Sequence, residues 1–197
     1  MFPTLVWKVQ IEAGRCEAIN AAILAAVARI RPEAPLAAGQ GWQSGQALHQ
    51  LEELRDLNAC VERSARSVLR FLKIAYDDLE ITACWANILA RGAAHKAHSH
   101  PNNFLSGVYY VQTDPAIDAI NFHDPRSQTA VIRPPVAELT AENTDQVVVR
   151  VRNGMLLLFP SYLEHSVDAN AGENERISVS FNIMFSAFTE KLAKPLW

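Results

Sequence analysis

Residues 95–111 read HKAHSHPNNFLSGVYYV and join a histidine cluster directly to a segment rich in β-forming residues. Three of the six histidines in the sequence fall between positions 95 and 100. Because side chains alternate between the faces of an extended strand, His98 and His100 are expected on the same face. A third histidine, His165, follows another strongly apolar segment far downstream. Two neighbouring imidazoles and a distant one predict a metal site on a β-scaffold.

The composition is ordinary for a globular protein, with 49% hydrophobic residues, 20% charged residues and a formal net charge of −3. So small a charge gives no reason to expect nucleic acid or an anionic membrane surface as a partner. No apolar run approaches the roughly 18 residues that span a bilayer, and the N-terminus lacks the pattern of a signal peptide. The three cysteines are far apart and are expected to be buried free thiols. These features predict a soluble protein in a reducing, cytoplasmic compartment.

Helical and strand patterns occupy different parts of the chain. Residues 4–11 are predicted as a strand, and residues 16–31 and 51–75 as helices with apolar side chains at helical spacing. A long polar insertion at residues 127–143 is a candidate lid or substrate loop. From residue 79 onward the pattern is that of strands, predicted at 79–89, 104–111, 117–122, 147–151, 155–159 and 177–185.

Helices first and antiparallel strands after them predict an α+β fold. Its core is expected to be a double-stranded β-helix of the jelly-roll or cupin type, with the N-terminal helices packed on one sheet. We expect a single domain over residues 1–197. Within it, residues 1–78 would form an N-terminal strand and helical support, and residues 79–188 the jelly-roll core with the metal site.

The chemistry of the histidine cluster favours a catalytic metal over a structural one. Imidazole ligands suit iron, zinc, copper or nickel better than magnesium or calcium. A structural zinc site usually has four ligands with cysteine among them, and no cysteine lies near these histidines in the sequence. Three ligands with coordination positions left over are typical of a catalytic site. The alternative is that these are ordinary surface histidines without a metal.

A row of polar residues marks the last predicted strand, where Arg176 shares one face with Ser178, Ser180 and Asn182. If that strand is central, this face is buried, and a buried arginine needs an anion. The planar guanidinium suits a carboxylate held by two hydrogen bonds, with the Ser178 hydroxyl beside it. The alternative is an exposed arginine on an ordinary alternating strand.

The C-terminal half resembles the iron(II)- and 2-oxoglutarate-dependent oxygenases, and more narrowly a bacterial and phage branch of them. The resemblance covers about half of the chain, while the N-terminal helical part carries no such signature. The blocks that carry it stand in the family's order: His-x-His-Pro-Asn at 98–102, Ser-Gly-Val-Tyr-Tyr-Val at 106–111, Asp-Pro-Arg at 124–126, Phe-Pro-Ser-x-x-x-His at 159–165 and Arg-Ile-Ser-x-Ser-Phe-Asn at 176–182.

The resemblance implies a set of iron ligands, with one departure. His98 matches the first ligand and His165 the distal histidine. The superfamily usually has His-x-Asp or His-x-Glu, which this sequence lacks, and His100 occupies the carboxylate's place. Either His100 is the third ligand, or water fills that position and His100 orients the ligands from outside. His95 is a weaker candidate, because its spacing from His98 suits a helix better than a strand.

The resemblance also implies a cosubstrate site. Arg176 matches the arginine that binds the remote carboxylate of 2-oxoglutarate, and Ser178 completes an Arg-x-Ser pair. Tyr109 lies where the family often places another cosubstrate contact, and Asn87 is expected to face the same cavity. Arg126, in the Asp-Pro-Arg block, is a candidate substrate contact.

The implied activity is that of a non-haem iron dioxygenase, a hydroxylase that couples 2-oxoglutarate decarboxylation to oxidation of a substrate C–H bond. Its cofactors would be Fe(II) and 2-oxoglutarate, with O₂ and a small-molecule or peptide substrate as partners. The sequence does not name the substrate and leaves open whether the protein is a homodimer. One alternative is a three-histidine cupin-type enzyme without 2-oxoglutarate, which explains His100 but leaves Arg176 and Ser178 unexplained. Another is a catalytically silent binding module on the same fold.

Overall fold

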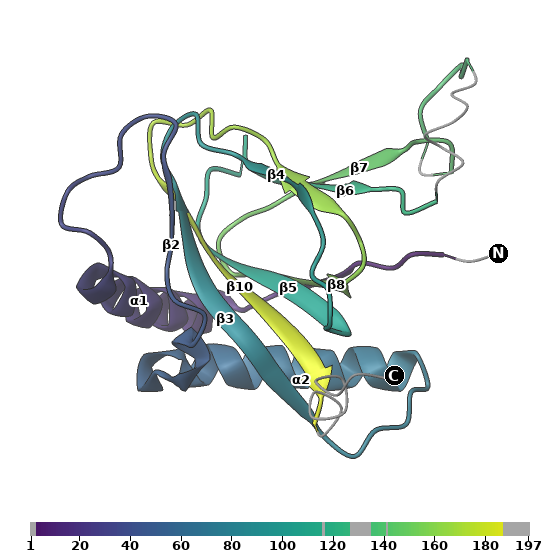
Figure 1. Cartoon of the computed structure of the whole chain (residues 1–197), viewed down its shortest axis with the longest axis horizontal. Helices are drawn as coiled ribbons and strands as arrows, with labels where there is room; N and C mark the ends of the chain where they lie inside the picture. The colour runs from purple at the N-terminus through teal and green to yellow at the C-terminus, as the bar shows by residue number, and fades with distance from the viewer. Residues whose placement is uncertain (1–2, 116, 127–134, 141, 187–197) are drawn as a thin grey trace, which may run out of the picture.

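The computed structural model describes residues 3–115, 117–126, 135–140 and 142–186 of the chain. Two antiparallel sheets face each other, and two long helices cover the far side of the larger sheet (Figure 1). Among the described residues, the larger sheet has six strands in the order β1-β8-β5-β10-β3-β2, and the smaller has four in the order β4-β9-β6-β7. This arrangement confirms the predicted jelly-roll core with N-terminal helices packed on one sheet.

The bounds of the predicted elements agree with the observed ones to within a few residues, and the strand at 79–89 agrees at both ends. The short strands at 41–43, 95–98 and 165–167 were not predicted. The larger sheet contains β1 (Trp7–Gln10), β2 (Gly41–Gln43), β3 (Leu79–Leu89), β5 (Leu105–Gln112), β8 (Met155–Pro160) and β10 (Arg176–Phe185). The smaller sheet contains β4 (His95–His98), β6 (Ala119–His123), β7 (Gln146–Arg150) and β9 (His165–Val167). The helices are α1 (Ala13–Ile30), η1 (Leu48–Gln50), η2 (Glu52–Leu54) and α2 (Arg55–Phe71).

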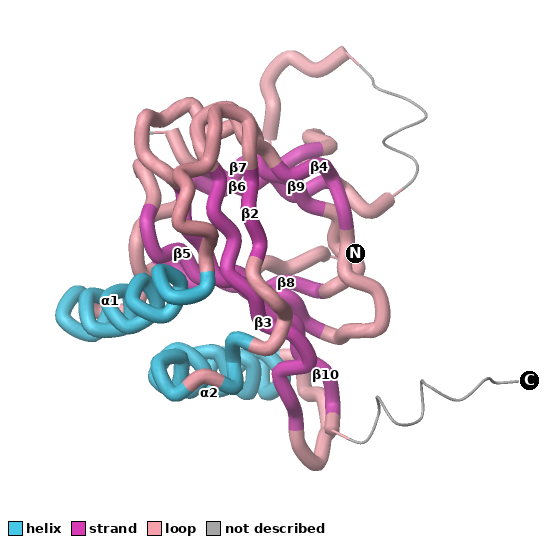
Figure 2. Tube along the Cα trace, turned by 60° about the vertical axis from the view of Figure 1, so that its left-hand side comes forward, coloured by secondary structure: helices cyan, strands magenta, loops and turns pink. Residues whose placement is uncertain are grey.

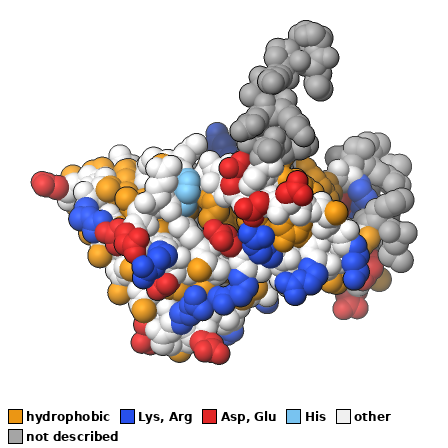
Figure 3. All heavy atoms as spheres, turned by 90° about the horizontal axis from the view of Figure 1, so that it is seen from below, with side chains coloured by type: hydrophobic (Ala, Val, Ile, Leu, Met, Phe, Trp, Pro, Cys, Tyr) orange, Lys and Arg blue, Asp and Glu red, His pale blue; other side chains and the backbone are white. Residues whose placement is uncertain are grey.

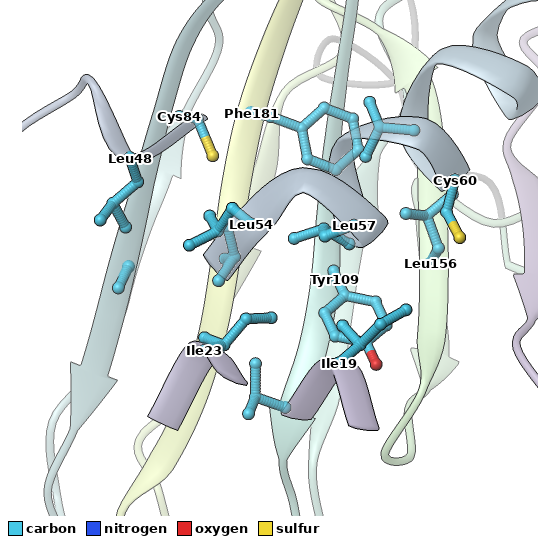
Figure 4. Close-up of a cluster of buried hydrophobic side chains, with 14 of the residues drawn as sticks. Ile19, Ile23, Leu48, Leu54, Leu57, Cys60, Cys84, Tyr109, Leu156 and Phe181 are labelled. Carbon is cyan, nitrogen blue, oxygen red and sulfur yellow. The ribbon is translucent and has the colours of Figure 1, made fainter. Parts of the chain in front are cut away.

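The main core lies between the helices and the larger sheet. Helix α1 buries Ile19 and Ile23, which are at most 3% exposed, because residues spaced by four lie on one face of a helix. The helix ends at Ile30, and the next residue, Arg31, has the extended backbone expected for a residue that precedes a proline. Figure 4 shows these side chains facing Tyr109 and Leu156 from the sheet. This packing buries the face of the larger sheet that lies away from the second sheet.

Two local features shape β5 and the turn that leads into it. Gly107 in β5 has no room for a side chain, because a Cβ there would lie 2.3 Å from the Phe181 ring and 2.5 Å from the Leu157 carbonyl oxygen. Asn102 has a φ of 63°, a left-handed conformation that asparagine tolerates better than most residues. The turn at Pro101 and Asn102 leads the chain from β4 in one sheet to β5 in the other.

The smaller sheet stands over the larger one on the side away from α1 and α2 (Figures 1 and 2). Much of the predicted insertion at 127–143 lies outside the described residues, and its described parts, 135–140 and 142–143, are in neither helix nor strand. On the face viewed from below, lysine and arginine side chains are interspersed with aspartate and glutamate (Figure 3). None of the helices in the described ranges has the length and apolar character needed to cross a membrane.

Candidate metal and cosubstrate site

Three histidines come together between the two sheets. His98 at the end of β4 is paired directly with His165 at the start of β9, so their side chains leave neighbouring strands side by side. The ring centroids are 4.4 Å apart for this pair, 5.1 Å for His98 and His100, and 5.2 Å for His100 and His165. Each residue offers a ligand atom within 4.8 Å of the others, and within the described ranges no aspartate or glutamate joins the group. One metal ion can reach all three imidazoles.

Hydrogen bonds fix two of these rings in the form that a metal requires. The Nδ1 atom of His98 lies 2.7 Å from the Lys96 carbonyl oxygen, and that of His165 lies 2.9 Å from the Leu163 carbonyl oxygen. Because a carbonyl oxygen only accepts, each Nδ1 carries the proton, and each Nε2 keeps a free lone pair. Metal-binding histidines are commonly oriented by such an outer hydrogen bond.

Burial keeps two imidazoles of the site, those of His165 and His100, neutral. Burial, together with the other histidines of the cluster, lowers the pKa of His165 to about 4, against the opposing effect of its hydrogen bond to Leu163. Burial likewise lowers the pKa of His100 to about 4, with His98 contributing. Neutral imidazole is the form that binds a metal, so these donors fit a borderline-soft divalent ion such as iron(II).

His100 reaches the site by a route that the sequence pattern did not predict. Strand β4 ends at His98, so His100 does not share a strand face with it, and the predicted alternation is wrong here. Instead His100 lies in the loop before Pro101, where its backbone N–H donates to the Ser161 carbonyl oxygen over 2.9 Å. Its ring packs against the Trp85 ring at a centroid distance of 5.7 Å. A loop, and not strand periodicity, brings the third imidazole to the other two.

Arg176 lies in the same pocket and is only 5% exposed, as its place on a central strand predicted. Its Nη1 atom donates to the Ala119 carbonyl oxygen over 2.9 Å, and its guanidinium lies over the Tyr110 ring, 5.4 Å from the centroid. The anion that a buried arginine needs is partly supplied by the protein, because Oδ1 of the buried Asp118 is 3.8 Å from Nη1. This pair could not be predicted from the sequence, since Asp118 is distant from Arg176 along the chain.

A row of polar side chains crosses the larger sheet beside Arg176. Ser178 is paired with Asn87 on β3 and with Tyr110 on β5, and all three line the pocket. The buried Tyr110 hydroxyl has no hydrogen bond of normal geometry to any described residue. Burial raises its pKa to about 12, against the opposing effect of Arg176, so it remains a donor near neutral pH.

The predicted cosubstrate contact at Tyr109 needs correction. Neighbouring residues of a strand point to opposite faces, and Tyr109 points toward the helices, where its hydroxyl donates to Asn20 Oδ1 over 2.7 Å. Tyr110 occupies the pocket face in its place. Val108, two residues before Tyr110 on the same face of β5, also lines the pocket.

Arg126 lies away from the histidine pocket, whereas Asn87 faces it as expected. Arg126 is not among the residues lining the histidine pocket; it pairs with Asp124 beside a separate hollow at one end of the sheets. Asn87 does face the pocket, but its Oδ1 atom accepts from Gln43 Nε2 over 2.8 Å and from Trp85 Nε1 over 3.2 Å. Its amide is therefore largely committed to neighbouring side chains.

The structure resembles solved oxygenases over nearly its whole length. A prolyl-4-hydroxylase from Pseudomonas putida has a TM-score of 0.64 at 15% identity, covering 92% of this chain and 93% of that one. HygX from Streptomyces hygroscopicus, solved with nickel and 2-oxoglutarate, has a TM-score of 0.63 at 12% identity, covering 94% and 84%. SnoK, a non-haem alpha-ketoglutarate-dependent carbocyclase from nogalamycin biosynthesis, has a TM-score of 0.66 at 14% identity, covering 98% and 87%. Such low identities establish a common fold.

The family itself is shown by sequence. No curated protein sequence matches the chain. A family model described as "Putative 2OG-Fe(II) oxygenase" matches residues 83–182, which run from β3 through β10 and include all three histidines and Arg176. The chain therefore belongs to the iron(II)- and 2-oxoglutarate-dependent oxygenases, a family whose cofactors are Fe(II) and 2-oxoglutarate.

Proposed function

We propose that this protein is a hydroxylase that binds iron(II) through His98, His100 and His165 and couples 2-oxoglutarate decarboxylation to oxidation of a substrate C–H bond. The observation that carries the proposal is the meeting of three imidazole donors and a buried arginine in one pocket. Bound iron and 2-oxoglutarate supply the oxidising chemistry when O₂ is present. The residues of the chain hold, orient and shield them.

The arginine side of the pocket is suited to the remote carboxylate of 2-oxoglutarate. Of the five N–H groups of Arg176, one donates to the Ala119 carbonyl oxygen, and the fork geometry of the others suits a carboxylate. The Tyr110 hydroxyl, buried beside the guanidinium, adds a donor that the protein does not otherwise use. The Ser178 hydroxyl lies in the same cross-strand row. These three groups are the proposed cosubstrate anchor.

The substrate is proposed to enter on the side where the two sheets present their edges. Gln43 and His98 are the exposed members of the pocket lining on this side, and they belong to β2 and β4, which are edge strands of the two sheets. A small molecule or a peptide side chain can approach the three histidines from there. The structural relatives include a prolyl-4-hydroxylase and a carbocyclase from nogalamycin biosynthesis, so enzymes with different reactions occur on this fold.

A three-histidine enzyme that does not use 2-oxoglutarate is the second candidate, favoured by one observation. Asp118 already faces Arg176, so the guanidinium has a partner without any cosubstrate. The match over residues 83–182 favours the 2-oxoglutarate enzyme.

An anaerobic titration separates the two candidates. Iron(II) and then 2-oxoglutarate are added without oxygen, and the weak visible charge-transfer band of the chelate is followed. O₂ is then admitted and succinate is measured, first alone and then with small-molecule and proline-containing peptide mixtures, in which a product gains one oxygen atom. A band and succinate in the wild type, both lost in His98→Ala, support the proposal. Iron binding without a band or succinate would support the second candidate, and failure to bind iron would support a silent binding module.

A further inference from the structure

The three imidazoles of the site are not held in the same way. His98 and His165 are each fixed by an Nδ1–H that donates to the carbonyl oxygen two residues earlier. Among the described residues, no hydrogen bond to a carbonyl fixes the ring of His100, and the residue lies beyond the end of β4. A ligand in a loop without such a bond needs another support to hold its ring toward a metal.

The ring of Trp85 provides that support from the opposite sheet. It meets the His100 ring with centroids 5.7 Å apart and planes inclined by 60°, an edge-to-face arrangement favourable for aromatic rings. Trp85 comes from the middle of β3, which is paired on both sides, with β10 and with β2. Trp85 thus belongs to an interior strand of the larger sheet.

The Trp85 ring is in turn fixed by Asn87. The indole N–H can only donate, so the Asn87 atom 3.2 Å away must be the oxygen. That orientation directs Asn87 Nδ2 to the Ser180 hydroxyl over 2.9 Å. It also requires that Gln43 donates to the same oxygen, over 2.8 Å. Side chains from β2, β3 and β10 therefore determine a single orientation of the indole.

We propose that Trp85 is the positioning residue for His100, with Asn87 as its anchor, and that this pair replaces the missing outer hydrogen bond of the third ligand. The inference rests on the proposed three-histidine ligand set. Loss of a residue that orients a ligand typically weakens metal binding by about 10–100-fold. Trp85→Leu is expected to weaken binding by that amount, and Asn87→Ala by less, because it frees the indole without removing it.

Cobalt(II) is a suitable probe, because its binding can be followed by calorimetry and by its visible absorption without any turnover. The matched control is Trp42→Phe, since Trp42 lies on the adjacent strand β2 and packs into the core on the helix side. Trp42→Phe should bind cobalt as the wild type does. Thermal unfolding checks that each variant folds. If Trp85→Leu does not fold, Trp85→Phe, which keeps an aromatic ring but loses the N–H, replaces it in the cobalt titration.

A double-mutant cycle tests whether Trp85 acts through His100. In a His100→Ala background, Trp85→Leu should cause no further loss of cobalt affinity, because the ring it positions is gone. An equal loss in both backgrounds would overturn the inference, as would wild-type affinity in Trp85→Leu when His100→Ala is weakened. If Trp85→Leu keeps wild-type affinity while His100→Ala is weakened, the proposed ligand set is still supported and only the role of Trp85 is refuted. Wild-type affinity in His100→Ala itself would instead refute the ligand set, and the role of Trp85 with it.

Discussion

His98 and His165 are direct cross-strand partners on β4 and β9, and their ring centroids lie 4.4 Å apart. These two histidines are far apart along the chain, and one antiparallel strand pairing brings them together. The geometry of the site therefore depends on the register of the smaller sheet. A slip of one residue would turn either side chain to the opposite face.

Replacing either member of this pair should abolish iron binding without unfolding the protein. His98→Ala and His165→Ala each remove a ligand, whereas the fold is held by the apolar faces of the sheets and helices. Anaerobic iron(II) titration and thermal unfolding measure the two effects. His49→Gln is the control, since His49 lies in η1 outside the pocket lining. Stoichiometric iron at wild-type affinity in both alanine variants would place the metal elsewhere.

His100 should behave as a ligand of the same rank as His98. His100→Ala is expected to weaken iron(II) binding about as much as His98→Ala does, because each supplies one imidazole to the cluster. A loss limited to about 10–100-fold would indicate an orienting role instead. His100→Asp, which restores the usual carboxylate of the superfamily, should recover part of the affinity. Unchanged iron affinity and turnover in His100→Ala would exclude the residue from the site.

Arg176→Ala should reduce the affinity for 2-oxoglutarate by roughly two orders of magnitude. Hydrogen bonds to charged groups contribute about 1.5–3 kcal/mol, and a tenfold change in affinity corresponds to about 1.4 kcal/mol. Arg176→Lys should recover only part, because an ammonium group lacks the planar fork. Isothermal titration of the iron-loaded protein measures this, with the exposed Arg91→Ala as control. Equal 2-oxoglutarate binding by wild type and Arg176→Ala would contradict the cosubstrate assignment.

Two adjacent tyrosines provide a matched test of the sheet face. Tyr110→Phe should weaken 2-oxoglutarate binding about tenfold, because it removes a buried donor beside Arg176. Tyr109→Phe should leave that affinity unchanged but cost about 1 kcal/mol of stability, since it breaks the bond to Asn20. Calorimetric titration and chemical unfolding of both variants distinguish the two outcomes. The reverse pattern would show that the cosubstrate lies on the other face.

The pair between Arg31 and Glu175 should make a pH-dependent contribution to stability. Both nitrogens of the Arg31 fork donate to the Glu175 carboxylate over 2.8 Å, and this bonding lowers the pKa of Glu175 below its ordinary value of 4.5. A carboxyl with a lowered folded-state pKa stabilises above its unfolded-state pKa, and the contribution is lost as pH falls through the folded-state value.

Arg31→Ala should therefore lower the melting temperature by up to about 4 °C near neutral pH, given about 0.2–1 kcal/mol for a surface pair and 2–4 °C per kcal/mol. The difference from wild type should fade in acid as Glu175 is protonated. Arg55→Ala, which breaks the exposed pair with Glu52, is the control and should have little effect at any pH. A difference that persists unchanged below pH 3 would show that the pair is not its cause.

The fold and the general position of the candidate site could be predicted from the sequence, and the reasons can be identified. β3 was predicted at both ends because a long apolar run is bounded by Asp78 and Gly92. His165 and Arg176 were found because each stands next to a strongly apolar strand. These signals come from residues close together along the chain, so they can be recognised from the sequence alone.

Contacts between segments far apart along the chain could not be predicted from the sequence. Asp118 meets Arg176 only because the smaller sheet folds over the larger one. The contact of Trp85 with His100 likewise joins a strand of one sheet to a loop that follows the other. The assignment of Tyr109 was wrong for a different reason. The family block at 106–111 identifies the strand that lines the pocket, but only the alternation of side chains along that strand decides which tyrosine faces the pocket.

Asp118 has a consequence for the charge of the filled site. In the usual ligand set, the carboxylate at the metal, the arginine, the ferrous ion and the two carboxylates of 2-oxoglutarate sum to zero. With the proposed three-histidine ligand set, the metal has no carboxylate ligand, and the buried carboxylate of Asp118 instead faces Arg176 at the other end of the pocket. The sum is again zero, with the negative charge moved from the metal to the anchor. The loaded pocket therefore stays neutral overall, but its two ends no longer balance separately: the metal end carries a net positive charge and the anchor end a net negative one.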